Sequence, residues 1–162
     1  MSNYFFEKKR RPPLIVILCL LTIINNSLSL IVGISNAIYG PSKSDAALPY
    51  KIPSDANQDL VEIIEQLGDF LVAINEHFYF FNTVSILLAT LGIIAAQKMF
   101  NGHKLGFHLY IIFSIASIAQ YYLLIPVENI STFYIITNLI FSCIYIMLYS
   151  KNLNWMNQKE TN

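Results

Sequence analysis

Four long, mainly apolar runs of residues dominate the hydrophobic pattern of the chain. They cover residues 14–34, 78–96, 105–125 and 130–150, and none of them contains an Asp, Glu, Lys or Arg. A helix needs about 20 consecutive, mainly apolar residues to cross a bilayer, so each run predicts a membrane-spanning helix. Aromatic residues gather at the ends of the runs, as in FYFF at 78–81, and this is typical of residues at a membrane interface.

A different pattern fills the segment between the first two runs. Residues 35–53 are rich in Gly and Pro and predict a loop, whereas residues 54–77 predict an amphipathic helix that begins at a Ser54-Asp55 cap. The apolar residues of this helix recur at spacings of three and four and form one seam, the outer-helix seam: Leu60, Ile64, Leu67, Leu71 and Ile74. No strong breaker follows, so we expect one continuous helix over residues 57–99, roughly 64 Å long at 1.5 Å per residue.

Short connections between the later runs predict antiparallel neighbours. About eight residues join the second and third runs, and about five join the third and fourth. The predicted fold class is all-α: an integral membrane four-helix bundle, with an extra-membrane amphipathic helix extending into the second transmembrane span. We expect one membrane domain over residues 1–162, with a tail at residues 151–162.

Composition supports a membrane protein. Apolar residues make up 55% of the chain and charged residues only 12%, whereas soluble domains carry roughly a quarter charged residues. The net charge is zero, so nothing in the composition favours nucleic acid as a partner.

The distribution of charge predicts an orientation. Eight of the ten basic residues lie in the two terminal segments and between the second and third runs, which share one side of a four-span protein. The positive-inside rule therefore predicts that both termini are cytoplasmic. The first run could instead be a signal peptide, but its length of 21 residues exceeds the usual apolar length of about 7–15.

Small and polar residues recur along one face of each predicted span. We expect this polar stripe to face the interior of the bundle, whereas Ile17, Leu18 and Ile136 face lipid. Such residues join helices in lipid through close packing and hydrogen bonds, and the alternative is a polar pathway or ligand pocket along the same faces. The residues of the polar stripe are Thr22, Asn25, Ser29, Asn82, Ser85, Ser117, Asn138 and Ser142.

The sequence predicts no catalytic, cofactor-binding or metal-binding residue. Cys19 and Cys143 form no Cys-x-x-Cys motif and are typical of small buried apolar residues. The side chains of Glu62, Glu65, Asp69, Glu76 and His77 lack the paired Glu-x-x-His motifs of a di-metal bundle, so we interpret them as a solvated helix surface.

A resemblance appears in the first span. The sequence Arg11-Pro12-Pro13-Leu14, followed by ILCLLTIINNSLSLIVG, resembles the opening of small, uncharacterised four-span membrane proteins of Bacteroidota. The resemblance covers mainly residues 11–33 and the four-span layout. It implies a location in a bacterial inner membrane and no particular activity.

These observations favour a non-enzymatic, polytopic protein of a bacterial inner membrane, acting as an accessory or interaction subunit of a membrane complex. Its partners would be the lipid bilayer and a membrane protein, a periplasmic protein or a second copy docked on the outer-helix seam. The alternative function is that of a small carrier, channel or lipid-binding protein that uses the polar stripe.

Overall fold

The computed structural model describes residues 11–41 and 57–160. This part of the chain is all-α, with six α-helices and two short 3₁₀ helices and no strand. The elements are α1 (Pro13–Tyr39), α2 (Gln58–Glu76), α3 (Phe78–Phe100), α4 (Lys104–Ala119), η1 (Gln120–Leu123), η2 (Val127–Asn129), α5 (Thr132–Ser150) and α6 (Leu153–Glu160).

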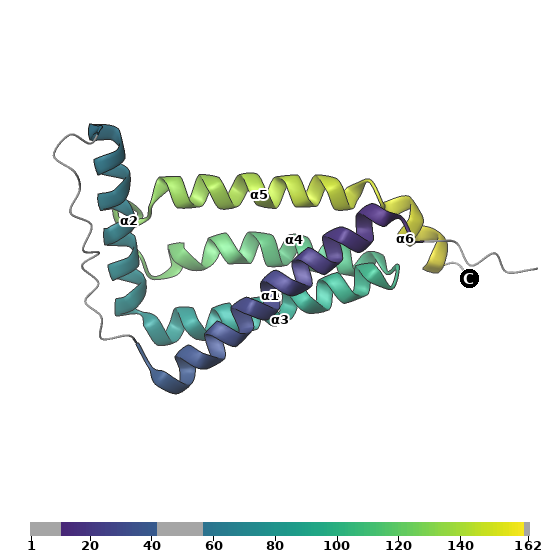
Figure 1. Cartoon of the computed structure of the whole chain (residues 1–162), viewed down its shortest axis with the longest axis horizontal. Helices are drawn as coiled ribbons and strands as arrows, with labels where there is room; N and C mark the ends of the chain where they lie inside the picture. Colours follow the sequence, from purple (N-terminus) through teal and green to yellow (C-terminus); the bar gives the residue numbers. More distant parts are fainter. Residues whose placement is uncertain (1–10, 42–56, 161–162) are drawn as a thin grey trace, which may run out of the picture.

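Four helices are long and apolar enough to cross a membrane: α1, α3, α4 continued by η1, and α5. They run along the long axis of the molecule, and α2 lies across one end of them (Figure 1). This arrangement confirms the predicted fold class and describes a multi-pass membrane protein. The short helix α6 lies at the opposite end from α2.

The helices pack unequally because small residues allow some of them to approach closely. The most extensive contacts are those of α1 with α3 and of α3 with α4, whereas α5 makes far fewer. A Cβ atom on Gly92 of α3 would lie 2.7 Å from Asn26 Oδ1 of α1, and one on Gly106 of α4 would lie 2.6 Å from the Ala95 carbonyl oxygen. Close backbone approach of this kind is how helices associate in lipid.

Two buried clusters hold the ends of the bundle. One joins α1, α3, α4, α5 and α6 around Met99, Tyr149 and Met156, each of which is fully buried. The other joins α2 to the far ends of the spans around Phe70 and Phe81, with Ile125 and Ile130 from the connection between α4 and α5.

The predicted continuous helix is wrong at one residue. The helix α2 ends at Glu76, His77 adopts non-helical angles (φ −107°, ψ 30°), and α3 begins at Phe78. The turn allows Phe70 and Ala73 to be buried against the end of the bundle, which a straight helix pointing away from the membrane would leave exposed. Burial of this apolar surface is the physical reason for the bend.

The start of α2 also differs from the expectation. The predicted Ser54-Asp55 cap lies outside the described residues, and the side chain of Asn57 instead accepts a hydrogen bond from the Asp59 backbone nitrogen at 3.2 Å. Asn57 therefore provides the N-terminal cap that Asn residues commonly form.

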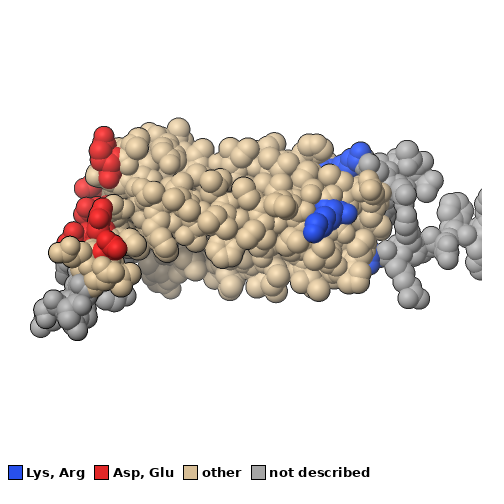
Figure 2. Space-filling model, turned by 90° about the horizontal axis from the view of Figure 1, so that it is seen from above, with Lys and Arg blue, Asp and Glu red and all other residues tan. Residues whose placement is uncertain are grey.

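Charge divides the molecule into two ends. Acidic side chains gather over α2 and basic side chains at the opposite end, with an uncharged surface between them (Figure 2). We call these the acidic end and the basic end. The exposed acidic residues of α2 are Asp59, Glu62, Glu65, Asp69 and Glu76. The basic residues whose side chains the structure describes are Arg11, Lys98, Lys104 and Lys151.

Candidate ligand pocket between the spans

A pocket of about 460 Å³ lies between α1, α3 and α4. It occupies the half of these helices next to the acidic end. Eight of its 14 lining residues carry an amide or hydroxyl group, and none carries an ionisable one. The lining residues are Asn25, Asn26, Leu28, Ser29, Val32, Gly33, Asn36, Asn82, Ser85, Leu88, Ala89, Phe113, Ser117 and Gln120.

The pocket opens sideways because α5 stands away from α1 at this depth. Near the basic end, Thr22 Oγ1 of α1 and the Tyr149 hydroxyl of α5 lie 2.8 Å apart. Towards the acidic end, α1 diverges from α5 (Figure 1), and no residue of α5 lines the pocket. Leu28 and Val32 at the opening are 59% and 57% exposed. The side facing α5 is therefore open towards the apolar surface of the spans.

The helix α5 also contacts the rest of the molecule at the acidic end. The hydroxyl groups of Tyr121 and Tyr134 lie 3.1 Å apart, and the ring of Phe70 lies against both tyrosine rings. The helix α5 is therefore held to the rest of the bundle near both of its ends, by Tyr149 and by Tyr134, and it contributes no residue to the pocket lining.

The polar groups of the pocket bond mainly to their own helices. Ser29 Oγ donates to the Asn25 carbonyl at 3.1 Å, Ser117 Oγ donates to the Ser114 carbonyl at 2.8 Å, and Gln120 Nε2 donates to the Ser117 carbonyl at 3.0 Å. In α3, Asn82 Nδ2 instead reaches across to the Gly33 carbonyl of α1 at 3.0 Å.

Gln120, which the predicted stripe does not include, is a further buried polar residue of the pocket lining. Its residue is 6% exposed, and its Oε1 atom has no hydrogen-bond partner within the described residues. A buried acceptor without a donor costs about 1–3 kcal/mol, so such an atom calls for an explanation. Gln120 lies within the third apolar run, beside the stripe of that span, and this position was the available signal.

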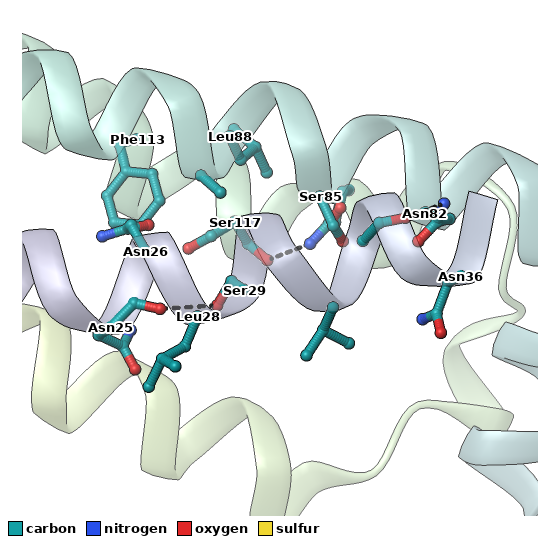
Figure 3. A pocket seen from close by; sticks show the side chains of 14 residues that line it. Asn25, Asn26, Leu28, Ser29, Asn36, Asn82, Ser85, Leu88, Phe113 and Ser117 are labelled. Atoms are coloured by element: carbon teal, nitrogen blue, oxygen red, sulfur yellow. Dashed lines mark hydrogen bonds between the residues drawn. The ribbon is translucent and has the colours of Figure 1, made fainter. Parts of the chain in front are cut away.

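On α1 the predicted stripe residue Thr22 is buried and Asn25 lines the pocket, but Asn26 rather than Asn25 is the asparagine buried against α3. Asn25 is exposed, whereas Asn26 is 4% exposed and donates from Nδ2 to the Thr22 carbonyl at 2.8 Å. Leu18, expected to face lipid, is also 4% exposed. The close approach of Gly92 decides the phase, because it leaves space on α3 for the Asn26 side chain. In Figure 3, Asn25 points away from α3, while the labelled side chains of α3 and α4 gather on the other side of α1.

The other stripe residues fall into two groups. Ser29, Asn82, Ser85 and Ser117 line the pocket, although Ser29 is exposed at its opening. Thr22 lies outside the pocket in the contact with Tyr149 described above. The two stripe residues of α5 are half-buried and do not line the pocket: Asn138, whose Nδ2 donates to the Tyr134 carbonyl, and Ser142.

The outer-helix seam is divided between the bundle and solvent. Ile74 packs against the cluster at the acidic end, and Ile64 and Leu67 are half-buried. Leu60 and Leu71 remain 55% and 46% exposed. The centre of the contact is Phe70, which is 1% exposed. Phe70 is not one of the residues predicted to form the outer-helix seam. Its ring centroid lies 5.1 Å from that of Tyr121 and 5.2 Å from that of Tyr134, and these aromatic contacts draw Phe70 inward.

The described residues contain no group of three or more His, Cys, Asp or Glu side chains that could hold a metal ion. Cys19 is buried and Cys143 is exposed, and both are free thiols. The pocket itself offers amide and hydroxyl groups, which bind and orient an uncharged polar group. No family model, curated protein or solved structure matches this chain.

Proposed function

We propose that this membrane protein acts by binding rather than by catalysis, and that its ligand is an amphipathic lipid held in the pocket between α1, α3 and α4. The observation that carries the proposal is a laterally open pocket of about 460 Å³ with eight polar lining residues. Small-molecule pockets commonly measure about 300–1,000 Å³ and combine an apolar wall with a few polar groups.

The physical argument concerns unmet hydrogen bonds at membrane depth. Polar groups inside a bilayer are costly unless they find partners, because lipid tails cannot supply them. A pure hydrocarbon chain in the pocket would offer no partner to the amide and hydroxyl groups of its lining. A molecule with a polar head and an apolar tail satisfies both the polar lining and the lipid-facing opening at Leu28 and Val32.

Native mass spectrometry of the full chain in mild detergent tests this function. The probe is an equimolar mixture of dioleoylglycerol, dioleoyl phosphatidylethanolamine and dioleoyl phosphatidylglycerol. We expect at least one lipid to be retained stoichiometrically, and Ser85→Phe to abolish its retention by filling the pocket. Thr83→Phe is the matched control, because Thr83 lies on the same helix, is exposed and does not line the pocket. Retention of no lipid, or equal retention by both variants, would contradict the proposal.

A second candidate function is that of an accessory subunit that docks a partner on α2. It is favoured by the exposed part of the outer-helix seam, Leu60 and Leu71, beside the exposed acidic side chains of the same helix. The partner would be a membrane protein, a periplasmic protein or a second copy. The double substitution Leu60→Ser and Leu71→Ser should release such a partner from affinity-purified native membranes without lowering the melting temperature. A partner retained by this variant would argue against docking at these residues.

The proposed setting is a bacterial inner membrane with the basic end in the cytoplasm. The separation of acidic and basic ends supports this orientation through the positive-inside rule (Figure 2). In a cysteine-free background, a membrane-impermeant thiol reagent should label Asp69→Cys in intact cells and Lys98→Cys only after permeabilisation. The reverse pattern would contradict the orientation.

A further inference from the structure

We infer that the pocket takes its lipid from one leaflet of the bilayer, the leaflet at the acidic end of the molecule, and that packed side chains around Tyr149 close it to the other leaflet. This inference rests on the proposed function and specifies which lipids of the bilayer reach the same site. We call the two layers of lipid the acidic-end leaflet and the basic-end leaflet. The inference depends on the depth of the pocket, the packing beyond it and the position of its opening.

The pocket covers one half of each span that lines it. Asn26 is the middle residue of α1, and the lining residues of this helix extend from Asn25 to Asn36, towards the acidic end (Figure 1). The lining residues of α3 lie within 82–89, between its midpoint and the same end, and those of α4 and η1 lie within 113–120. The stretch of α1 measures about 16 Å at 1.5 Å per residue, which is about half of a hydrocarbon core roughly 30 Å thick. The pocket therefore has the depth of a single leaflet.

Buried side chains close the bundle beyond the pocket. Asn26 of the lining donates from Nδ2 to the Thr22 carbonyl at 2.8 Å, and Thr22 Oγ1 lies 2.8 Å from the Tyr149 hydroxyl of α5. Towards the basic end, the cluster around Tyr149 continues with Cys19 and Met99, which are fully buried. A polar headgroup that crosses such a cluster loses its hydration without finding partners, which is costly. The cluster is therefore a barrier between the pocket and the basic-end leaflet.

The opening lies in the same half as the pocket. Leu28 and Val32 are exposed on α1 where this helix diverges from α5 (Figure 1), and Ser29 is exposed beside Leu28 (Figure 3). A lipid of the acidic-end leaflet lies at this depth, so its polar part can enter sideways while its acyl chains stay in the bilayer. A lipid of the basic-end leaflet would first have to cross the bilayer.

Photo-crosslinking with lipids confined to one leaflet tests the inference. The full chain is reconstituted in liposomes with an affinity tag after α6, at the basic end. Affinity capture then separates vesicles that expose the basic end from vesicles that expose the acidic end. The probes are phosphatidylethanolamine, phosphatidylglycerol and glucosyl diacylglycerol, each with a diazirine in one acyl chain close to its ester group. Their polar headgroups slow their crossing of the bilayer.

The probes are exchanged into the outer leaflet of the vesicles, irradiated at once, and the adducts are located by tandem mass spectrometry. We expect at least about tenfold more adducts at Ser85 and Ser117 of the lining when the probes lie in the acidic-end leaflet than when they lie in the basic-end leaflet. Ile17 is the internal control, because it is 55% exposed in the basic half of α1. It should be labelled from the basic-end leaflet, which shows that probes in that leaflet reach the protein.

A variant tests whether Tyr149 forms the barrier. Tyr149→Ala removes the side chain that joins α5 to Thr22, so the ratio of lining adducts from the two leaflets should fall towards one. Ile144→Ala is the matched control, because Ile144 lies on the same helix and is 45% exposed, and it should keep the ratio of the unaltered protein. An unchanged ratio in Tyr149→Ala would contradict the role of Tyr149. If this variant does not fold, the ratio measured on the unaltered protein still decides.

Two results would overturn the inference and leave the proposed function standing. They are equal labelling of the pocket lining from both leaflets, or stronger labelling from the basic-end leaflet. Absence of lining adducts from either leaflet would also overturn the inference. The proposed function falls with it only if native mass spectrometry retains no lipid either.

Discussion

Replacing Phe70 by alanine should detach α2 from the end of the bundle while leaving the four spans folded. Phe70 is 1% exposed, and its ring packs against Tyr121 and Tyr134 with centroid distances of 5.1 and 5.2 Å. The cluster around it joins α2 to Phe81 and to the connection between α4 and α5. The other buried cluster, at the basic end, shares no residue with it. The loss should therefore be local to α2.

The magnitude follows from the burial of the ring. Truncating a buried Phe to Ala costs about 3–5 kcal/mol in protein cores, and α2 can relax at the surface, so the lower value of about 3 kcal/mol applies. This raises the population of the open state of α2 about a hundredfold. The neighbouring Leu71 is 46% exposed, so Leu71→Ala should cost at most about 1 kcal/mol, or a factor of about five.

Hydrogen exchange of the α2 amides in lipid nanodiscs measures both variants. We expect exchange in the second half of α2 to accelerate about a hundredfold in Phe70→Ala and only slightly in Leu71→Ala, with α1 and α3 protected in both. Equal acceleration in the two variants, or none in Phe70→Ala, would refute the docking of α2 through Phe70.

Further substitutions test the helix contacts. Gly106→Ala should lower thermal stability in detergent by up to about 2 kcal/mol, because its Cβ would meet backbone atoms of α3 and overpacking exceeds the gain in helix propensity. A Cβ atom on Gly68 would have nothing within 4 Å, so Gly68→Ala should stabilise α2 by up to about 1 kcal/mol. If both glycine substitutions changed the stability in the same direction, the close contact of Gly106 with α3 would be contradicted. Asn26→Phe should destabilise the α1–α3 pair by about 1–3 kcal/mol, whereas Asn25→Phe should be tolerated. The opposite ranking in thermal melts would contradict the burial of Asn26 between α1 and α3.

The spans could be predicted from sequence because their signal is local. A run such as residues 130–150 has the length and apolarity that a bilayer demands, whatever it packs against. The helix of α2 could be predicted for the same reason, since its apolar residues recur at helical spacing within one segment.

Contacts between distant segments could not be predicted in this way. Asn25 and Asn26 are adjacent and chemically identical, and only the space beside Gly92 on another helix selects Asn26 for burial. The bend at His77 likewise depends on Phe70 finding Tyr121 and Tyr134, which lie about fifty residues or more further along the chain. Nothing in the local pattern encodes these partners.

The pocket has one feature that could be predicted from the local sequence and one that could not. Ser29, Asn82, Ser85 and Ser117 were predicted to lie on interior faces, and the structure places all four around one space. That the space is open rather than filled depends on how far α5 stands from α1, which the polar spacing of neither helix reveals.

Photo-crosslinking of a dioleoylglycerol analogue, with a diazirine in one acyl chain close to its ester group, tests most directly whether the pocket is a lipid site. The full chain is irradiated in nanodiscs, and the adducts are located by tandem mass spectrometry. We predict adducts within residues 25–36, 82–89 and 113–120, lost on addition of excess unlabelled dioleoylglycerol and in Ser85→Phe. Adducts confined to the exposed surface of α5, within residues 136–147 and undiminished by the unlabelled lipid, would contradict a lipid site between α1, α3 and α4.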